Sequence, residues 1–117
     1  MSHTRYASCR LRAVNPELLL SVLEMLRKEY GGEVVVDEKY GPMLRWSRHG
    51  YFTVSESGGK VSFVYDSWAM PVSFDTVRDR FYHYYNVAAI SRAMRKIGYS
   101  VNLRSTGSRT EIVGVRL

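Results

Sequence analysis

The sequence predicts an α+β domain in which two helices pack on one face of an antiparallel sheet, in the order β-α-β-β-β-β-α-β-β. Two segments carry apolar residues at three- and four-residue spacing behind helix-capping residues. Short alternating or β-branched segments, separated by glycine turns, fill the rest of the chain. A chain of 117 residues with 45% hydrophobic residues fits a single domain, 1–117, with a real core.

The first elements are a strand and a capped helix. Residues 4–12 alternate between apolar and polar, and Cys9 falls on the inward face of this half-buried strand. Asn15 is a favoured N-cap residue, and Pro16 suits the first position of a helix. The apolar spacing then continues until Gly31, where we expect the helix to end.

Four strands are expected next, over residues 33–37, 43–48, 51–56 and 60–66. Turn-forming residues separate them, including Gly41-Pro42, Gly50 and Gly58-Gly59. Because short turns join consecutive strands, this part of the sheet should be antiparallel. The order of the strands within the sheet stays open.

The second helix is expected over residues 74–97, after a crossing loop at 67–72. Ser73 resembles an N-cap, and Gly98 marks the end of the helix. Two further strands, 99–105 and 110–117, close the chain as a hairpin.

The faces of this second helix decide whether its aromatic residues belong to the core or to a binding surface. One apolar row comprises Phe74, Val77, Phe81, Tyr84 and Ala88, which we assign to the core. The predicted outer face comprises Arg78, Tyr82, Tyr85, Arg92 and Lys96. Basic groups interleaved with aromatic rings favour nucleic-acid binding, because cations neutralise phosphates and rings stack on bases. A merely solvated helix face is the alternative.

The net charge of +6 lies almost entirely in the C-terminal part of the chain. Residues 1–73 hold nine Lys or Arg against eight Asp or Glu, whereas residues 74–117 hold eight against three. A local positive field attracts phosphate backbones and other polyanions. Arg104 and Arg109, on the closing hairpin, would extend the basic face of the second helix. The alternative is that these charges only keep a small domain soluble.

The sequence contains no catalytic or cofactor constellation that we recognise. No metal-ligand spacing joins its three histidines and single cysteine, and Cys9 is expected to be an inert inward thiol. No phosphate-binding glycine motif occurs, so we expect neither an enzyme nor a cofactor. No apolar run is long enough to span a membrane, and no secretory signal opens the chain, so a cytoplasmic location is expected. The absence of glutamine is a tendency of thermophilic proteins.

Several short motifs resemble one family. The chain opens Met-Ser-His, carries Tyr82-His83-Tyr84 within the second helix, passes through Gly98-Tyr99-Ser100-Val101, and finishes near Val113-Gly114-Val115. In these features, mainly over residues 63–117, it resembles the uncharacterised hypothetical chloroplast open reading frame 35 family of plastids, cyanobacteria and other prokaryotes. Members of that family are often linked with AAA-type ATPases, so the resemblance implies a protein-partner role and no catalytic residue.

Two functions follow as expectations. The first is a non-enzymatic module that docks on RNA or a ribonucleoprotein. Its phosphate contacts and stacking rings would be Arg78, Tyr82, Tyr85, Arg92, Lys96, Arg104 and Arg109. The alternative is a protein-interaction adaptor, for example for an AAA-type ATPase, that uses free strand edges and the loop containing Trp68 and Met70.

Overall fold

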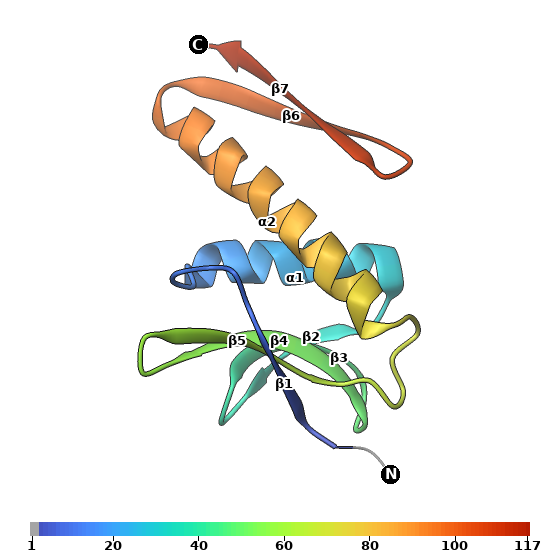
Figure 1. Cartoon of the computed structure of the whole chain (residues 1–117). Coiled ribbons are helices and arrows are strands. Elements are labelled where there is room, and N and C mark those ends of the chain that lie inside the picture. The colour runs from blue at the N-terminus through green and yellow to red at the C-terminus, as the bar shows by residue number, and fades with distance from the viewer. Residues whose placement is uncertain (1–2) are drawn as a thin grey trace.

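The computed structural model describes residues 3–117, and it confirms the α+β class and the predicted order of elements (Figure 1). Met1 and Ser2 of the opening Met-Ser-His motif lie outside the described residues. The elements are β1 (Arg5–Ser8), α1 (Pro16–Tyr30), β2 (Glu33–Asp37), β3 (Gly41–Ser47), β4 (Gly50–Ser57), β5 (Lys60–Asp66), α2 (Phe74–Lys96), β6 (Tyr99–Thr106) and β7 (Arg109–Arg116).

Both helices begin at the predicted caps. The Asn15 side chain accepts hydrogen bonds from the backbone N–H groups of Glu17 and Leu18, which would otherwise lack partners in the first turn of α1. The Ser73 hydroxyl accepts from the Thr76 N–H in the same way at the start of α2. Neither helix is long and apolar enough to cross a membrane.

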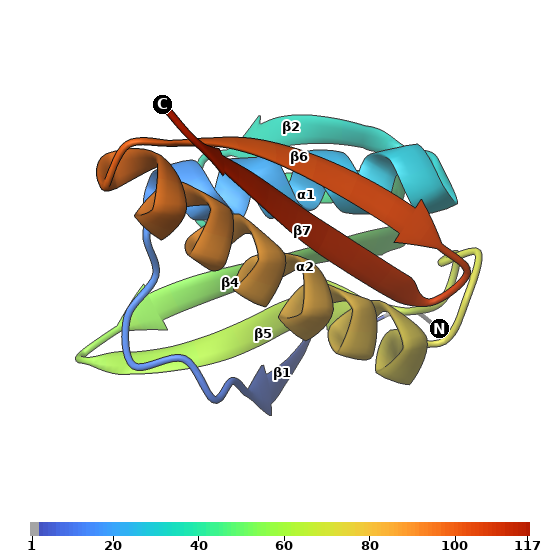
Figure 2. The ribbon, with the colours of Figure 1, turned by 90° about the horizontal axis from the view of Figure 1, so that it is seen from above.

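The strands form two sheets rather than one. Five antiparallel strands lie in the order β1-β5-β4-β3-β2, so the first strand is at an edge. The closing hairpin β6–β7 pairs only with itself among the described strands. The expected two-layer arrangement therefore holds for the larger sheet and the helices, while the hairpin stands apart on the far side of α2 (Figures 1 and 2).

The core lies between the larger sheet and the helices. Phe52, Phe63 and Phe81 are fully buried, and their ring centroids lie 5.5–5.8 Å apart. Phe74 adds a fourth ring, 5.7 Å from Phe63 and stacked on Tyr65 at 3.8 Å. The N-terminal half of α2 is thus anchored in the sheet by aromatic packing.

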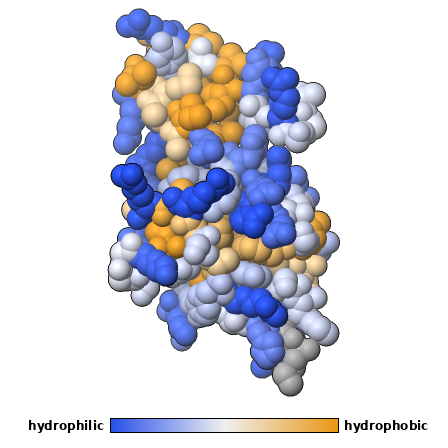
Figure 3. Space-filling view, viewed as in Figure 1, coloured by the Kyte–Doolittle hydropathy of each residue, from blue (hydrophilic) through white to orange (hydrophobic). Residues whose placement is uncertain are grey.

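The hairpin packs along α2, from Arg80 in its first half to Met94 near its end. Arg80 donates to the backbone carbonyl of Ser108 at 3.2 Å, and His83 Nε2 hydrogen-bonds the Thr110 hydroxyl at 2.8 Å. Near the other end, Gly114 passes so close to Met94 that a Cβ there would lie 2.1 Å from the methionine methyl. The result is an elongated molecule of 52 × 33 × 22 Å with α2 as its bridge. Apolar surface remains visible over this upper part of the molecule (Figure 3).

Candidate nucleic-acid interface

Tyr82 and Tyr85 do not form the free stacking faces that the helix pattern predicted. Both are half-buried and pack against the core, with the Tyr82 ring 5.5 Å from Phe63 and the Tyr85 ring 5.7 Å from Phe81. The Arg10 guanidinium covers the Tyr82 ring at 4.1 Å. Since a base needs an open ring face, these two tyrosines do not offer a stacking platform.

The hydroxyl groups of Tyr82 and Tyr85 also have hydrogen-bond partners. The Tyr82 hydroxyl accepts from the Arg10 N–H at 3.1 Å, and the Tyr85 hydroxyl accepts from the Asn15 N–H at 3.5 Å. The segment between β1 and α1 therefore lies over this side of α2. Both tyrosines join distant parts of the chain, which is a structural role.

Arg78 and Arg92 lie on α2 as predicted, but acidic residues neutralise both. Arg78 contacts Asp75 at 3.2 Å and Asp79 at 3.1 Å, so its surroundings carry more negative than positive charge. Arg92 contacts Glu17 at 3.2 Å and also donates to the side-chain oxygen of Asn15. A phosphate approaching Arg78 would meet two carboxylates.

Lys96, Arg104 and Arg109 differ from the paired arginines of α2 in their electrostatic surroundings. All three are exposed, and none forms an ion pair with any of residues 3–117. Arg95 and Arg116, which the sequence pattern did not single out, share this property. From position 95 onward the chain contains five basic residues and a single acidic residue, Glu111. That scarcity of carboxylates after Asp79 is the sequence signal that could have identified Arg95 and Arg116.

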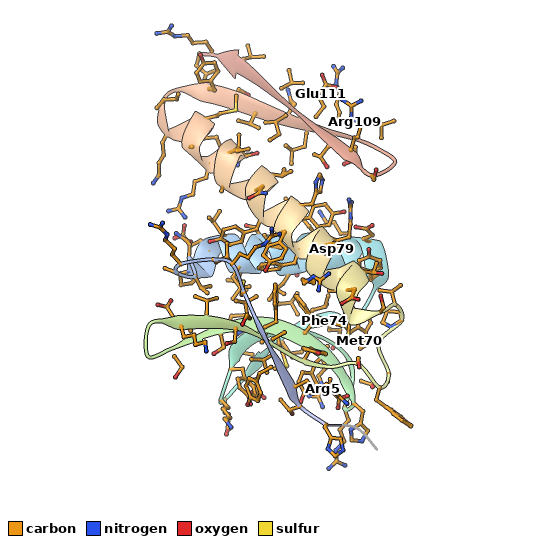
Figure 4. All side chains as sticks on the ribbon, viewed as in Figure 1. Arg5, Met70, Phe74, Asp79, Arg109 and Glu111 are labelled. Atoms are coloured by element: carbon orange, nitrogen blue, oxygen red, sulfur yellow. The ribbon has the colours of Figure 1, made fainter. Side chains whose placement is uncertain are left out.

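The register of the hairpin places its side chains on two faces. Leu103 pairs with Ile112, and Val101 pairs with Gly114, on the face that packs against α2. The opposite face therefore carries the pairs Arg104–Glu111 and Thr106–Arg109, together with Ser100–Val115 and Asn102–Val113. Figure 4 shows Arg109 and Glu111 on the hairpin, at the opposite end of the molecule from Arg5. Arg104 and Arg109 thus lie on the solvent side of a ribbon about 23 Å long, whereas Arg116, paired with Tyr99, lies at its other end on the α2 side.

A polar cluster beneath the tip of the hairpin fixes its position on α2. Glu29 of α1 accepts from Arg80 at 3.2 Å and also from the Tyr84 hydroxyl. Burial, followed by the hydrogen bond to Glu29, raises the pKa of Tyr84. Burial, reinforced by the charge of Arg80, lowers the pKa of His83. Both groups are therefore held neutral near pH 7 as hydrogen-bonding partners between α1, α2 and the hairpin.

The loop with Trp68 and Met70 presents only one of these two side chains. Trp68 is 68% exposed, whereas Met70 is half-buried against the core. The Ala69 N–H donates to the carbonyl of His49, and a Cβ on Gly50 would lie 2.7 Å from the Ala69 backbone. The loop is therefore seated closely on the start of β4, with the indole projecting outward.

Cys9 is half-buried, and burial raises its pKa, which disfavours the reactive thiolate. His83 is engaged with Thr110 rather than with Cys9. Within residues 3–117, no three His, Cys, Asp or Glu side chains converge as metal ligands would.

Comparisons with protein-family models, with curated proteins and with solved structures found no match to this chain. The resemblance inferred from short motifs stays a prediction.

Proposed function

We propose that the protein is a non-enzymatic module that docks on RNA, or on a ribonucleoprotein, through phosphate contacts made by the β6–β7 hairpin and the C-terminal end of α2. The observation that supports this proposal is the segregation of charge. Basic residues of α2 up to Arg92 are paired with carboxylates, whereas those from Arg95 onward are not. Unpaired cations can replace the counterions of a phosphate backbone, and their release drives binding.

The proposed contacts are Lys96, Arg104, Arg109 and Arg116. They lie at the two ends of a ribbon about 23 Å long, so they could contact phosphates that are several nucleotides apart on one strand. No aromatic side chain lies on the solvent face of the hairpin, since Tyr99 pairs with Arg116 on the α2 side. Binding is therefore proposed to depend on phosphates rather than on base stacking, with little sequence preference.

The test is the affinity for a mixed-sequence single-stranded RNA of twenty nucleotides, measured by fluorescence anisotropy as a function of salt. If the four cations each contact one phosphate, log affinity should fall with log salt at a slope of about −3. Changing the four contacts to glutamine should bring that slope close to zero.

The matched control removes four exposed cations of the five-stranded sheet and its turns: Arg5, Lys39, Arg48 and Lys60. It lowers the net charge by the same amount, so it separates a local surface from overall charge. The control should keep the wild-type slope within experimental error. Equal losses in both variants, or an unchanged slope in the hairpin variant, would contradict the proposal.

A second candidate, a protein-interaction adaptor, is favoured by the single observation that a closely seated loop holds Trp68 outward. Exposed aromatic anchors on rigid supports are typical centres of protein interfaces. Under this alternative, a protein partner would be retained at high salt by the wild type and lost by Trp68→Ala. Retention of every partner by Trp68→Ala would exclude it.

A further inference from the structure

A groove runs between α1 and β6, with α2 as its inner wall. Two neighbouring cavities of about 300 and 240 Å³ make up the groove, and both are lined by Met25 of α1 and Leu103 of β6. Tyr84 and Val87 of α2 line the first cavity, while Ala88 and Ser91 line the second. In Figure 2, β6 lies on the side of the hairpin nearer α1, whereas β7 lies over α2.

The outer edge of β6 borders this groove. Among the described strands β6 pairs only with β7, so its other edge has backbone N–H and C=O groups without strand partners. The edge contains no proline or bulge that would block pairing. A two-stranded ribbon is also marginal alone, and a third strand would extend it. An extended chain entering the groove could therefore hydrogen-bond along β6.

The groove matches one strand in length. The 15 residues of α1 span about 22 Å, and an extended segment of six or seven residues covers the same distance. The walls are apolar along the middle, so alternate side chains of such a segment would enter the two cavities. The residues that make the apolar lining are Leu18, Met25, Val87, Ala88 and Leu103.

The charged and polar side chains of the groove indicate which kind of peptide segment it would bind. Glu17 and Glu29 line the groove but are already neutralised by arginines of α2. Lys28 lines one cavity and Arg95 the other, and neither has an ion-pair partner within residues 3–117. Ser91, which is 2% exposed, has a hydroxyl without any hydrogen-bond partner. The groove therefore presents positive charge toward both ends and an unsatisfied polar group on its inner wall.

We propose that this groove binds an extended segment of a partner protein, with apolar side chains at alternate positions and an acidic residue at each end, as a third strand on β6. The groove is separate from the proposed RNA contacts, because none of Lys96, Arg104, Arg109 and Arg116 lines either cavity. Neither proposal depends on the other.

The first test uses isothermal titration calorimetry and the synthetic peptide acetyl-Glu-Thr-Val-Thr-Val-Thr-Glu-amide, in which the valines and the terminal glutamates share one face of the strand. Backbone N-methylation removes donors, and in a strand alternate donors point to opposite sides. Methylating the residues of one alternation phase should weaken binding at least tenfold, while methylating the other phase should change it less than twofold. Replacing both glutamates with lysine should weaken binding by about fivefold.

Leu103→Ser and Val115→Ser form a matched pair, since both remove an apolar side chain from the hairpin, one on each face. Leu103→Ser should reduce peptide affinity at least tenfold and leave RNA affinity unchanged, whereas Val115→Ser should keep peptide binding. Three results would overturn the proposal: no binding at millimolar peptide, equal effects of the two methylation phases, or equal effects of the two variants. A dimer through paired β6 edges, seen by sedimentation, would overturn it as well.

Discussion

Replacing Phe81 with alanine is the most informative perturbation of the fold, because this side chain joins α2 to the sheet. Phe81 is fully buried, and four aromatic rings lie within 6.1 Å of it. Removing a ring from such a site costs about 4 kcal/mol. A chain of this length has a total stability of roughly 6 to 18 kcal/mol, so the variant should still fold.

Urea denaturation followed by circular dichroism measures the effect. With a slope of about 2 kcal/mol per molar urea, the midpoint should fall by about 2 M. Ile90→Ala is the control, since Ile90 lies on the same helix at 50% exposure and should cost about 1 kcal/mol or less. A midpoint for Phe81→Ala within 0.5 M of the control (roughly 1 kcal/mol) would refute the inference that the aromatic cluster anchors α2.

Three further predictions concern close packing, titration and local stability. Gly50→Ala should destabilise by about 2 kcal/mol, because its Cβ would meet the Ala69 backbone. Gly114→Ala should cost less, because its Cβ would meet side chains alone, the flexible end of Met94 and the edge of the Tyr99 ring; equal midpoints in urea would contradict this. Because the pKa of His83 is lowered in the folded protein, the unfolded chain takes up a proton first as pH falls below about 6.5. The free energy of unfolding should therefore be at its full value above that pH and decline below it. His83→Gln should flatten this decline. In hydrogen-exchange experiments, the amides of β6 and β7 should exchange with solvent faster than those of β4 and β5. The reason is that the hairpin has two strands and rests on one helix. Equal protection would contradict this prediction and show that the hairpin and the core open together.

Local signals were sufficient to predict most elements of the fold. Asn15 and Ser73 bond to the first turns of their helices as expected, because capping depends on residues only two or three positions away. The placement of the closing hairpin was not predictable in this way. Alternation shows that two strands pair, but not whether they join a larger sheet, which depends on contacts such as that between His83 and Thr110.

The candidate site was predictable only in part, for the same reason. Asp75 and Asp79 lie one turn or less from Arg78, so neutralisation of that arginine is visible in the sequence. The partner of Arg92, however, is Glu17 on the other helix. The burial of Tyr82 likewise depends on Arg10, which is 72 residues away along the chain. Helical periodicity describes one helix and carries no information about such distant segments.

The most direct test of the proposed RNA contact is its location, mapped by NMR on the ¹⁵N-labelled protein titrated with the same single-stranded RNA. Binding through the solvent face of the hairpin predicts that the largest shift changes fall on Lys96, Arg104, Arg109 and their neighbours. The amides around Arg78 and Tyr82 should change little. Changes centred on Trp68 or on the N-terminal half of α2, or no changes at low salt, would contradict the proposed function.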